Sequence, residues 1–431
     1  MFVSVENIDG HMKRTVLSLV TACLLLPGFA ASPKIRISDP EKKKVDELLS
    51  QMTVREKVAQ IFVVQIDRNN NAEERMEQDS LVRLGLGGII IMRGPVAPFM
   101  DRANELQAMS KLPLMMCTDA EWGAAMRFYE YMDYPRQSQL SKIPHAEKLL
   151  YKMGRNVAKE LKDLNIYVNF APVADIAESG RDTYVARRFS HGPKHVADYA
   201  SAYMRGMQDG GIYACGKHFP GHGDVYVDSH VELPVFYYTR EHVDSTYLVP
   251  FQRLVDDGVA FMMMGHHAIL AIDPQVIPMS ISEKCVTELL KGEMGFDGIV
   301  VTDALQMGGV ANGRTPVEVV MSAYKAGVDM LLMPDEPIVC IEALTQAFEN
   351  GSLPVAGLDE RVRKILTLKV KAGFFKKGYD PVVRDLQKKI SRARHRDSLL
   401  IDKMKRAMSA GDSLEIVPTY DPTLFLDRGR D

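Results

Sequence analysis

The sequence is poor in cysteine and carries little net charge. Only 5 of its 431 residues are cysteine, and their spacing matches neither a disulfide framework nor a zinc site. We therefore expect buried thiols at Cys117, Cys215, Cys285 and Cys340. The net charge of -3 predicts no polyanionic partner and disfavours nucleic acid. A hydrophobic content of 46% with 25% charged residues is typical of a soluble globular protein.

The apolar segment at the N-terminus, residues 16–29, is short for a membrane-spanning helix and is interrupted by Pro27 and Gly28. Two basic residues precede it and the small residues 30–32 follow it, an order typical of a secretory signal with its cleavage site. We therefore predict a signal peptide over residues 1–31. The mature chain is expected to be exported, periplasmic or secreted, with no membrane-spanning segment.

A second interpretation of the N-terminus is a lipid anchor. Residues 20–23 resemble a lipobox, which would make Cys23 a lipidated N-terminus. The three leucines that follow Cys23 argue against this interpretation.

Eight short apolar runs recur along the chain, at residues 61–64, 88–91, 114–117, 167–170, 212–215, 260–264, 298–301 and 328–332. They are continuous rather than alternating, as expected for strands buried on both faces. Amphipathic segments separate them, among them 148–164, 194–207 and 240–255. The alternation predicts an α/β fold, a (β/α)8 TIM barrel over residues 32–375. The alternative is an open doubly wound sheet, but no glycine-rich nucleotide fingerprint follows the first run.

The chain changes character after Phe375. Residues 384–408 are highly charged and basic, and residues 417–431 are rich in turn formers. We predict a short charged helical tail over residues 376–431, because this length is too small for an ordinary second domain. The chain is therefore expected to hold a single catalytic domain.

Titratable side chains gather where the apolar runs end. The sequence CGKHFPGHGDVYVDSH (215–230) continues the fifth run, and its Pro and Gly residues exclude a helix while its charges exclude a core position. A polar loop on a buried strand is a usual place for catalytic groups. Asp119, Asp175, His266 and Asp303 follow other runs, and in a barrel these strand ends share one face.

Five motifs occur in order along the predicted barrel: DAEWG (119–123), NFAPVADI (169–176), RRFS (187–190), KHFPGHGDVYVDSH (217–230) and VTDAL (301–305). Together they resemble the motifs of glycoside hydrolase family 3, in its β-N-acetylglucosaminidase branch. Ala120, Trp122 and Ala124 depart from the Gln, Gly and Arg usual in that family. These changes affect the rim of the site rather than its charged groups.

The resemblance implies a retaining β-N-acetylhexosaminidase that needs no cofactor or metal. Its carbohydrate substrate would be a terminal β-linked N-acetylglucosaminide, with cell-wall fragments among the candidates. It implies that Asp303 is the nucleophile, His230 the general acid/base and Asp228 the partner of that histidine. The residues implied to hold the sugar are Asp119, Arg127, Arg187, Lys217 and His218.

The residue chemistry agrees with these roles. Retaining hydrolysis needs a carboxylate that attacks the anomeric carbon and a group that protonates the leaving oxygen. An imidazole that titrates near neutral pH can be that proton donor, and Asp228 is close enough in sequence to fix the tautomer of His230.

Other interpretations remain open on sequence grounds. A β-glucosidase of the same family would share the motifs, and a non-catalytic sugar-binding relative would have lost Asp303 or His230. A metal-dependent barrel hydrolase would need an H-x-H pair at the end of the first run, where the chain has Gln65-Ile66-Asp67. Asp303 could also be a helix N-cap, Asp175 a structural hydrogen-bonding group and His266 a core histidine. Many relatives carry further domains after the barrel.

Overall fold

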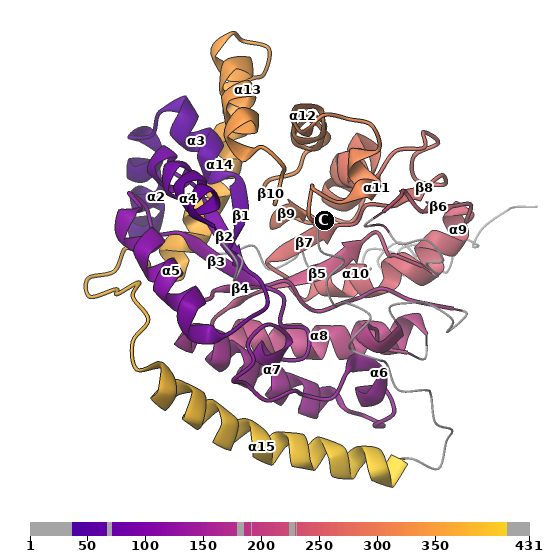
Figure 1. The fold of residues 1–431 in the computed structure, drawn as a ribbon. Helices are drawn as coiled ribbons and strands as arrows, with labels where there is room; N and C mark the ends of the chain where they lie inside the picture. Colours follow the sequence, from indigo (N-terminus) through magenta and orange to yellow (C-terminus); the bar gives the residue numbers. More distant parts are fainter. Residues whose placement is uncertain are drawn as a thin grey trace, which may run out of the picture.

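The computed structural model describes residues 37–66, 71–178, 185–190, 192–223, 229 and 231–411. In this part of the chain, eight parallel strands form one sheet in the order β10-β1-β2-β3-β4-β5-β7-β9. Their bounds are β1 (Phe62–Ile66), β2 (Gly88–Ile91), β3 (Met115–Thr118), β4 (Val168–Asn169), β5 (Tyr213–Phe219), β7 (Phe261–Met264), β9 (Ile299–Thr302) and β10 (Leu331–Leu332). A bridge between Val301 and Met330 joins the two outer strands and closes the sheet into a barrel (Figure 1).

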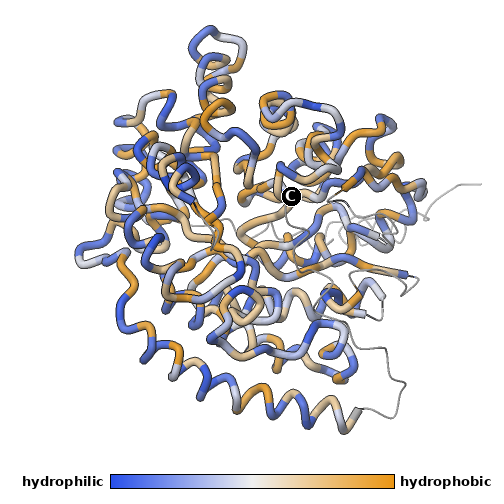
Figure 2. The backbone as a smooth tube through the Cα atoms, in the orientation of Figure 1, coloured by the Kyte–Doolittle hydropathy of each residue, from blue (hydrophilic) through white to orange (hydrophobic). Residues whose placement is uncertain are grey.

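The predicted (β/α)8 barrel is therefore confirmed, and the open sheet is excluded. Each of the eight predicted runs overlaps a strand, and every residue of β2, β3, β7 and β9 is buried. Strands covered on both faces can be continuously apolar, because neither side chain direction points to water. Figure 2 shows the apolar strands inside and more polar segments on the surrounding helices.

Helices follow the strands and cover the outside of the barrel. Before and between the first strands lie α2 (Asp39–Ser50), α3 (Val54–Gln60), α4 (Ala72–Leu84) and α5 (Val96–Met109). The segment between β3 and β5 holds η1 (Ala124–Met126), α6 (Gln137–Leu140), α7 (Glu147–Asp163), η2 (Val185–Arg187) and α8 (Pro193–Asp209). The second half holds η4 (Met279–Ile281), η5 (Lys284–Glu293), α11 (Gly308–Ala311), α12 (Pro316–Ala326), α13 (Pro337–Glu349) and α14 (Val355–Lys371).

The amphipathic segment 240–255 is not one regular helix. It divides into α9 (Arg240–His242), a π-helical turn η3 (Val243–Tyr247) and α10 (Leu248–Asp256). Pro250 in the first turn of α10 has no backbone N–H, so it cannot make the hydrogen bond that would continue an α-helix through this point. A separate pair of two-residue parallel strands, β6 (Val235–Phe236) and β8 (Ala268–Ile269), is too short to give a sequence pattern.

The last described helix, α15 (Leu386–Gly411), lies on the outside of the molecule along α7 (Figure 1). It occupies most of the basic segment in which a helical tail was expected. The predicted signal peptide and the end of the tail lie outside the described residues. Among the helices that the structure describes, none is long and apolar enough to cross a membrane.

Four of the cysteines fall within the described residues, and all four are buried free thiols, as expected: Cys117, Cys215, Cys285 and Cys340. Burial raises the pKa of the Cys340 thiol to about 12. These thiols are therefore protonated and chemically inert at neutral pH.

A lysine is buried at the end of the barrel where the strands begin. Lys369 on α14 is fully buried, and its Nζ donates to Gln60 Oε1 at 2.9 Å. Gln60, just before β1, donates in turn to the backbone oxygen of Gly85 at 2.6 Å. Burial lowers the pKa of Lys369 to about 7. The folded protein therefore releases this proton at a pH where an unfolded chain keeps it.

We predict that Lys369→Met abolishes a pH dependence of stability. Between pH 7 and pH 10 the unfolded chain binds one proton more than the fold, so the free energy of unfolding should rise with pH, by up to about 1.4 kcal/mol per unit. Methionine has a similar volume and no proton, so the variant should lack this rise. Urea unfolding at several pH values measures it, with exposed Lys403→Met as the control. Parallel profiles for parent and variant would contradict the prediction.

Candidate active site

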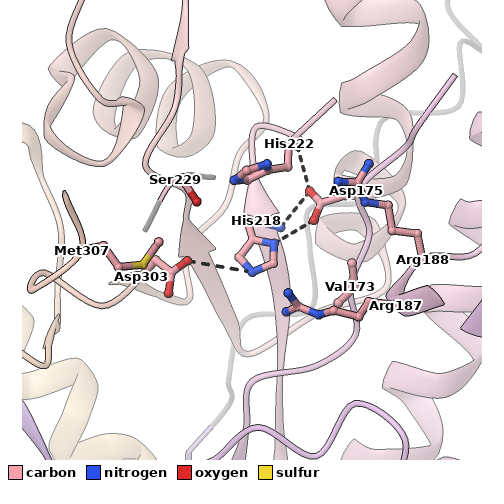
Figure 3. A pocket seen from close by; sticks show the side chains of 9 residues that line it. All are labelled: Val173, Asp175, Arg187, Arg188, His218, His222, Ser229, Asp303 and Met307. Atoms are coloured by element: carbon pink, nitrogen blue, oxygen red, sulfur yellow. Dashed lines mark hydrogen bonds and ion pairs between the residues drawn. The ribbon is translucent and has the colours of Figure 1, made fainter. Parts of the chain in front are cut away.

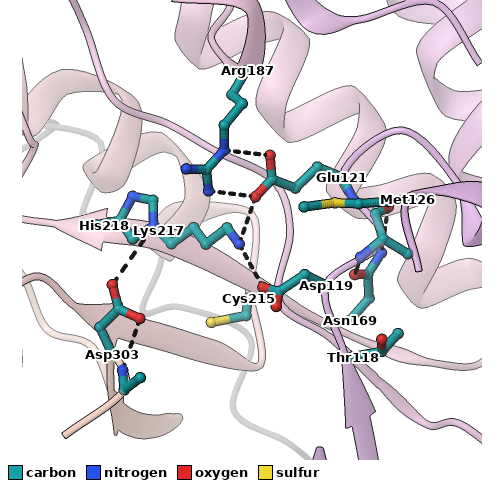
Figure 4. Close-up of polar contacts among 12 residues, drawn as sticks. Thr118, Asp119, Glu121, Met126, Asn169, Arg187, Cys215, Lys217, His218 and Asp303 are labelled. Carbon is teal, nitrogen blue, oxygen red and sulfur yellow. Dashed lines mark hydrogen bonds and ion pairs between the residues drawn. The ribbon is translucent and has the colours of Figure 1, made fainter. Parts of the chain in front are cut away.

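An ionic cluster lies where β3 and β5 end. Lys217, in β5, places its Nζ 2.7 Å from Asp119 Oδ1 and 2.7 Å from Glu121 Oε1 (Figure 4). Arg187 binds both oxygens of Glu121, with Nη2 at 2.6 Å and Nε at 2.9 Å. Arg127 pairs with the second oxygen of Asp119. The structure therefore brings together four of the predicted sugar-binding residues.

The charges of this cluster stabilise one another. Burial alone would raise the pKa of Asp119, but Lys217 and Arg127 hold it well below its usual range. Burial is likewise outweighed at Glu121, where Arg187 and Lys217 lower the pKa to about 2. Burial would lower the pKa of Lys217, yet the two carboxylates raise it. All these groups are therefore ionised across the neutral pH range.

Glu121 organises the ionic cluster, which its place in the DAEWG motif did not predict. Its side chain is fully buried and joins Arg187 to Lys217. The sequence feature that points to Glu121 is its position two residues after Asp119. Alternate residues of an extended segment point to the same side, so the two acids can face the same partner.

A second group of contacts fixes His218. The Nδ1 atom of His218 lies 2.7 Å from Asp175 Oδ2, and its backbone N–H donates to Asp175 Oδ1 at 3.0 Å. The same oxygen accepts the backbone N–H of His222 at 2.9 Å. Although burial would raise the pKa of Asp175, His218 holds it well below its usual range. Asp175 is thus the structural hydrogen-bonding group that its position suggested, and it orients the other nitrogen of His218 outward.

That nitrogen faces Asp303. His218 Nε2 lies 3.9 Å from Asp303 Oδ2, while Asp303 Oδ1 accepts the backbone N–H of Ala304 at 2.8 Å (Figure 4). Asp303 directly follows β9, and its backbone N–H donates to Met264 O, at the end of the neighbouring strand β7, at 2.9 Å. Helix α11 begins after Met307, so the N-cap interpretation of Asp303 is wrong.

The environment of Asp303 keeps the carboxylate charged. Burial would raise its pKa, but His218, His266 and the Ala304 N–H lower it. The side chain is 21% exposed, so a substrate can reach it. A charged, positioned and accessible carboxylate is what nucleophilic attack requires.

His266 is a satisfied core histidine. It is buried, its Nδ1 lies 2.8 Å from Ser280 Oγ, and its Nε2 lies 3.0 Å from the backbone oxygen of Ala304. Burial lowers the pKa of His266. Its role is to support the residue that follows Asp303 rather than to form the wall of the site.

Asp303 and His218 face Arg187 across a small pocket (Figure 3). The residues that line it are Val173, Asp175, Arg187, Arg188, His218, His222, Ser229, Asp303 and Met307. Asp119 and Lys217 do not line this pocket. Ion pairs through Glu121 connect them to Arg187, which does. The predicted catalytic residues Asp228 and His230 lie outside the described residues, on either side of Ser229.

This arrangement combines a carboxylate with donors and acceptors for hydroxyl groups. Within the residues that the structure describes, no three His, Cys, Asp or Glu side chains form a group that could hold a metal ion. Lys217 is already held by two carboxylates, so it is a fixed cation. The site can therefore bind a polar substrate beside an attacking oxygen.

Comparison with known proteins gives a consistent result. The profile described as "Glycosyl hydrolase family 3 N terminal domain" matches residues 53–368. A protein named β-hexosaminidase from Nitrosospira multiformis is 32% identical over 282 residues, which are 63% of this chain and 80% of that protein. A β-hexosaminidase from Tolumonas auensis is 38% identical over 272 residues, 61% of this chain and 78% of the relative.

Solved structures resemble the fold. A family 3 β-N-acetylglucosaminidase from Paenibacillus sp. has a TM-score of 0.72 and 28% identity, and the match covers 83% of this chain and 69% of that one. A β-N-acetylhexosaminidase from Beutenbergia cavernae has a TM-score of 0.67 and 25% identity, with 74% of this chain and 99% of the other covered.

We predict that Glu121→Gln weakens substrate binding while the protein stays folded. The amide keeps the shape but removes the charge that Arg187 and Lys217 share, so kcat/KM should fall by about 100-fold, mainly through KM. An aryl β-N-acetylglucosaminide, the substrate implied by the motifs, provides the assay. Asp133→Asn, at an acid 64% exposed in the same segment, is the matched control. Equal kinetics in both variants would show that Glu121 does not organise the site.

Proposed function

Because the chain belongs to glycoside hydrolase family 3, we propose that it removes terminal β-linked N-acetylglucosamine by a retaining mechanism. It is a glycoside hydrolase, and the relatives named β-hexosaminidase support N-acetylglucosaminides as its substrates. The observation that carries the proposal is Asp303. This carboxylate is charged, is partly exposed at a strand end, and uses one oxygen on Ala304 while the other faces His218.

The proposed reaction has two steps. The Asp303 oxygen forms a bond to the anomeric carbon as the bond from that carbon to the leaving oxygen breaks, and His230 gives its proton to the leaving oxygen. Water then attacks the anomeric carbon of the resulting ester, gives its proton to His230, and releases Asp303 as a carboxylate. Asp228 is assigned the role of orienting the imidazole of His230.

The ionic cluster is proposed to hold the sugar. Each oxygen of Asp119 already accepts a hydrogen bond from one cation, Lys217 or Arg127, and each keeps a lone pair for a sugar hydroxyl. Arg127, Arg187 and Lys217 supply donors for hydroxyl or acyl oxygens, and the outward Nε2 of His218 can bond a hydroxyl. Because Asp119, Glu121 and Asp175 hold these side chains, little reorganisation is needed when substrate arrives.

We further propose that the protein is exported and acts on glycan or cell-wall fragments. Export is supported by the basic, apolar and small-residue order of residues 13–32 in the sequence.

Asp303→Ala should abolish turnover and leave the fold intact. Without the carboxylate no glycosyl–enzyme ester can form, so kcat should fall on the order of 10⁴-fold or more. Circular dichroism and thermal unfolding check the fold. The control is Asp297→Ala, at an exposed acid just before β9. Turnover near the parental value would remove Asp303 from the role of nucleophile.

A panel of aryl β-glycosides tests the substrate. We expect kcat/KM for the β-N-acetylglucosaminide to exceed that for the β-glucoside by several powers of ten, because donors left without an acyl oxygen cost about 1–3 kcal/mol each. Near-equal values would favour the β-glucosidase alternative. The anomer first released, followed by NMR, separates retention from inversion.

A further inference from the structure

The inner face of α15 carries a buried acid. The face turned toward the barrel is otherwise apolar, with Ile390, Ala393, Ile401 and Met404 all buried. Asp397 lies in the middle of this stripe and is also fully buried. An acid at such a position destabilises the packing unless partners satisfy it, so its contacts indicate a specific role.

Asp397 binds groups from three parts of the chain. Its Oδ1 accepts a hydrogen bond from the hydroxyl of Tyr134 at 2.8 Å. Arg396 of the same helix donates from Nε to Oδ1 at 2.8 Å and from Nη2 to Oδ2 at 3.0 Å. Glu160, on the neighbouring helix α7, is fully buried and lies close enough to Asp397 for that acid to raise its pKa. Two carboxyl groups can hydrogen-bond only when one of them holds a proton.

Glu160 is the member of the pair whose surroundings favour a proton. Its Oε2 accepts the backbone N–H of Ala124 at 2.9 Å, whereas its buried Oε1 has no donor in the described structure. Burial raises the pKa of Glu160 far above its usual range, and Asp397 raises it further. A proton on Oε1 would let this atom donate to Asp397 while Oε2 accepts from Ala124.

The contact with Ala124 leads directly to the sugar-binding residues. Ala124 begins η1, its oxygen accepts the backbone N–H of Arg127 at 3.0 Å, and the Arg127 side chain binds Asp119. The backbone N–H of Tyr134 donates to Trp122 O at 3.3 Å. A Cβ at Gly123 would lie only 2.8 Å from the Tyr134 ring, so these segments are tightly packed.

We propose that α15 positions the sugar-binding loop 119–127 through a proton shared by Glu160 and Asp397. Loss of that proton leaves two buried negative charges facing each other, which separates α15 from α7 and releases Ala124. Arg127 and Asp119 then lose their fixed positions, and substrate binds more weakly. Glu160 and Asp397 are positioning residues, and the inference rests on the sugar-binding role proposed for Asp119 and Arg127.

The direction of the pH effect follows from the raised pKa of Glu160. The pair contributes its full stabilisation below the ordinary pKa of a glutamate, and this contribution is lost as pH rises through the higher pKa in the fold. KM should therefore rise with pH. The other titratable or charged groups around Glu160 are Arg396, Asp397, Tyr131, Tyr134, Tyr203 and Asp163.

The decisive variant is Glu160→Gln. Its amide oxygen can accept from Ala124 and its amide N–H can donate to Asp397, as the protonated acid does, but it does not titrate. We expect its KM for an aryl β-N-acetylglucosaminide to stay within about twofold of the parent at pH 6 and to remain low at pH 9. The parental KM should rise at least about fivefold relative to this variant over that range.

Glu160→Leu removes both contacts and should raise KM about tenfold at pH 6, with a smaller change in kcat. Lys388→Ala, on the exposed face of α15, is the control and should match the parent at each pH. Thermal unfolding accompanies every measurement. If Glu160→Leu fails to fold, the pH profile of Glu160→Gln decides.

The outcomes separate two failures. An alkaline rise of KM in Glu160→Gln equal to the parental one overturns the proposal, as does a Glu160→Leu variant that loses only thermal stability. If Asp119→Ala keeps the parental KM, the sugar-site assignment itself is wrong, whatever the Glu160 variants do.

Discussion

The buried ammonium of Lys217 is the interaction on which the ionic cluster beside the pocket depends. Removing a lysine from water costs several kcal/mol, and this chain offsets that cost with two carboxylates at 2.7 Å. Each carboxylate holds a further cation, Arg127 on Asp119 and Arg187 on Glu121. Lys217 joins the two carboxylates, so the five side chains form one connected network. The polar groups are therefore oriented before a substrate arrives.

The opposite side of the pocket is fixed by the barrel itself. Asp303 follows β9 and donates its backbone N–H to the neighbouring strand β7, so its position depends on the register of the sheet. Asp175 follows β4 and His218 lies in the adjacent strand β5; two contacts join them, and a third holds the backbone of His222 on Asp175. Because β5, β7 and β9 are neighbouring parallel strands, their pairing brings the ends of β5 and β9 together, with 3.9 Å between His218 and Asp303.

The sequence was informative where local pattern decides structure. Continuous apolar runs predicted every strand of the barrel, because strands buried on both faces leave no polar alternation. The two-residue strands β6 and β8 and the π-helical turn at Val243–Tyr247 left no such pattern.

Charged side chains were harder to predict, because their burial depends on partners that lie far away in sequence. Glu121 had no predicted role beyond its place in a motif, yet it forms ion pairs with Arg187 and Lys217. Asp397 looked like one charge in a basic surface helix, yet the hydroxyl of Tyr134 reaches it across 263 positions of sequence. His266 could be assigned to the core only when Ser280 and Ala304 were seen beside it.

The carboxyl groups of the site and of the structure behind it divide into two kinds by their surroundings. Asp119, Glu121, Asp175 and Asp303 each face a cation, an imidazole or a backbone N–H, and their pKa values are lowered despite burial. Glu160 faces another acid, and its pKa is raised. The carboxylates of the site are thus held ionised, whereas burial and Asp397 favour a proton on Glu160 behind the loop 119–127. Loss of a proton from Glu160 would therefore alter the position of the loop 119–127, while the carboxylates of the site stay charged. We therefore expect the pH response to change KM.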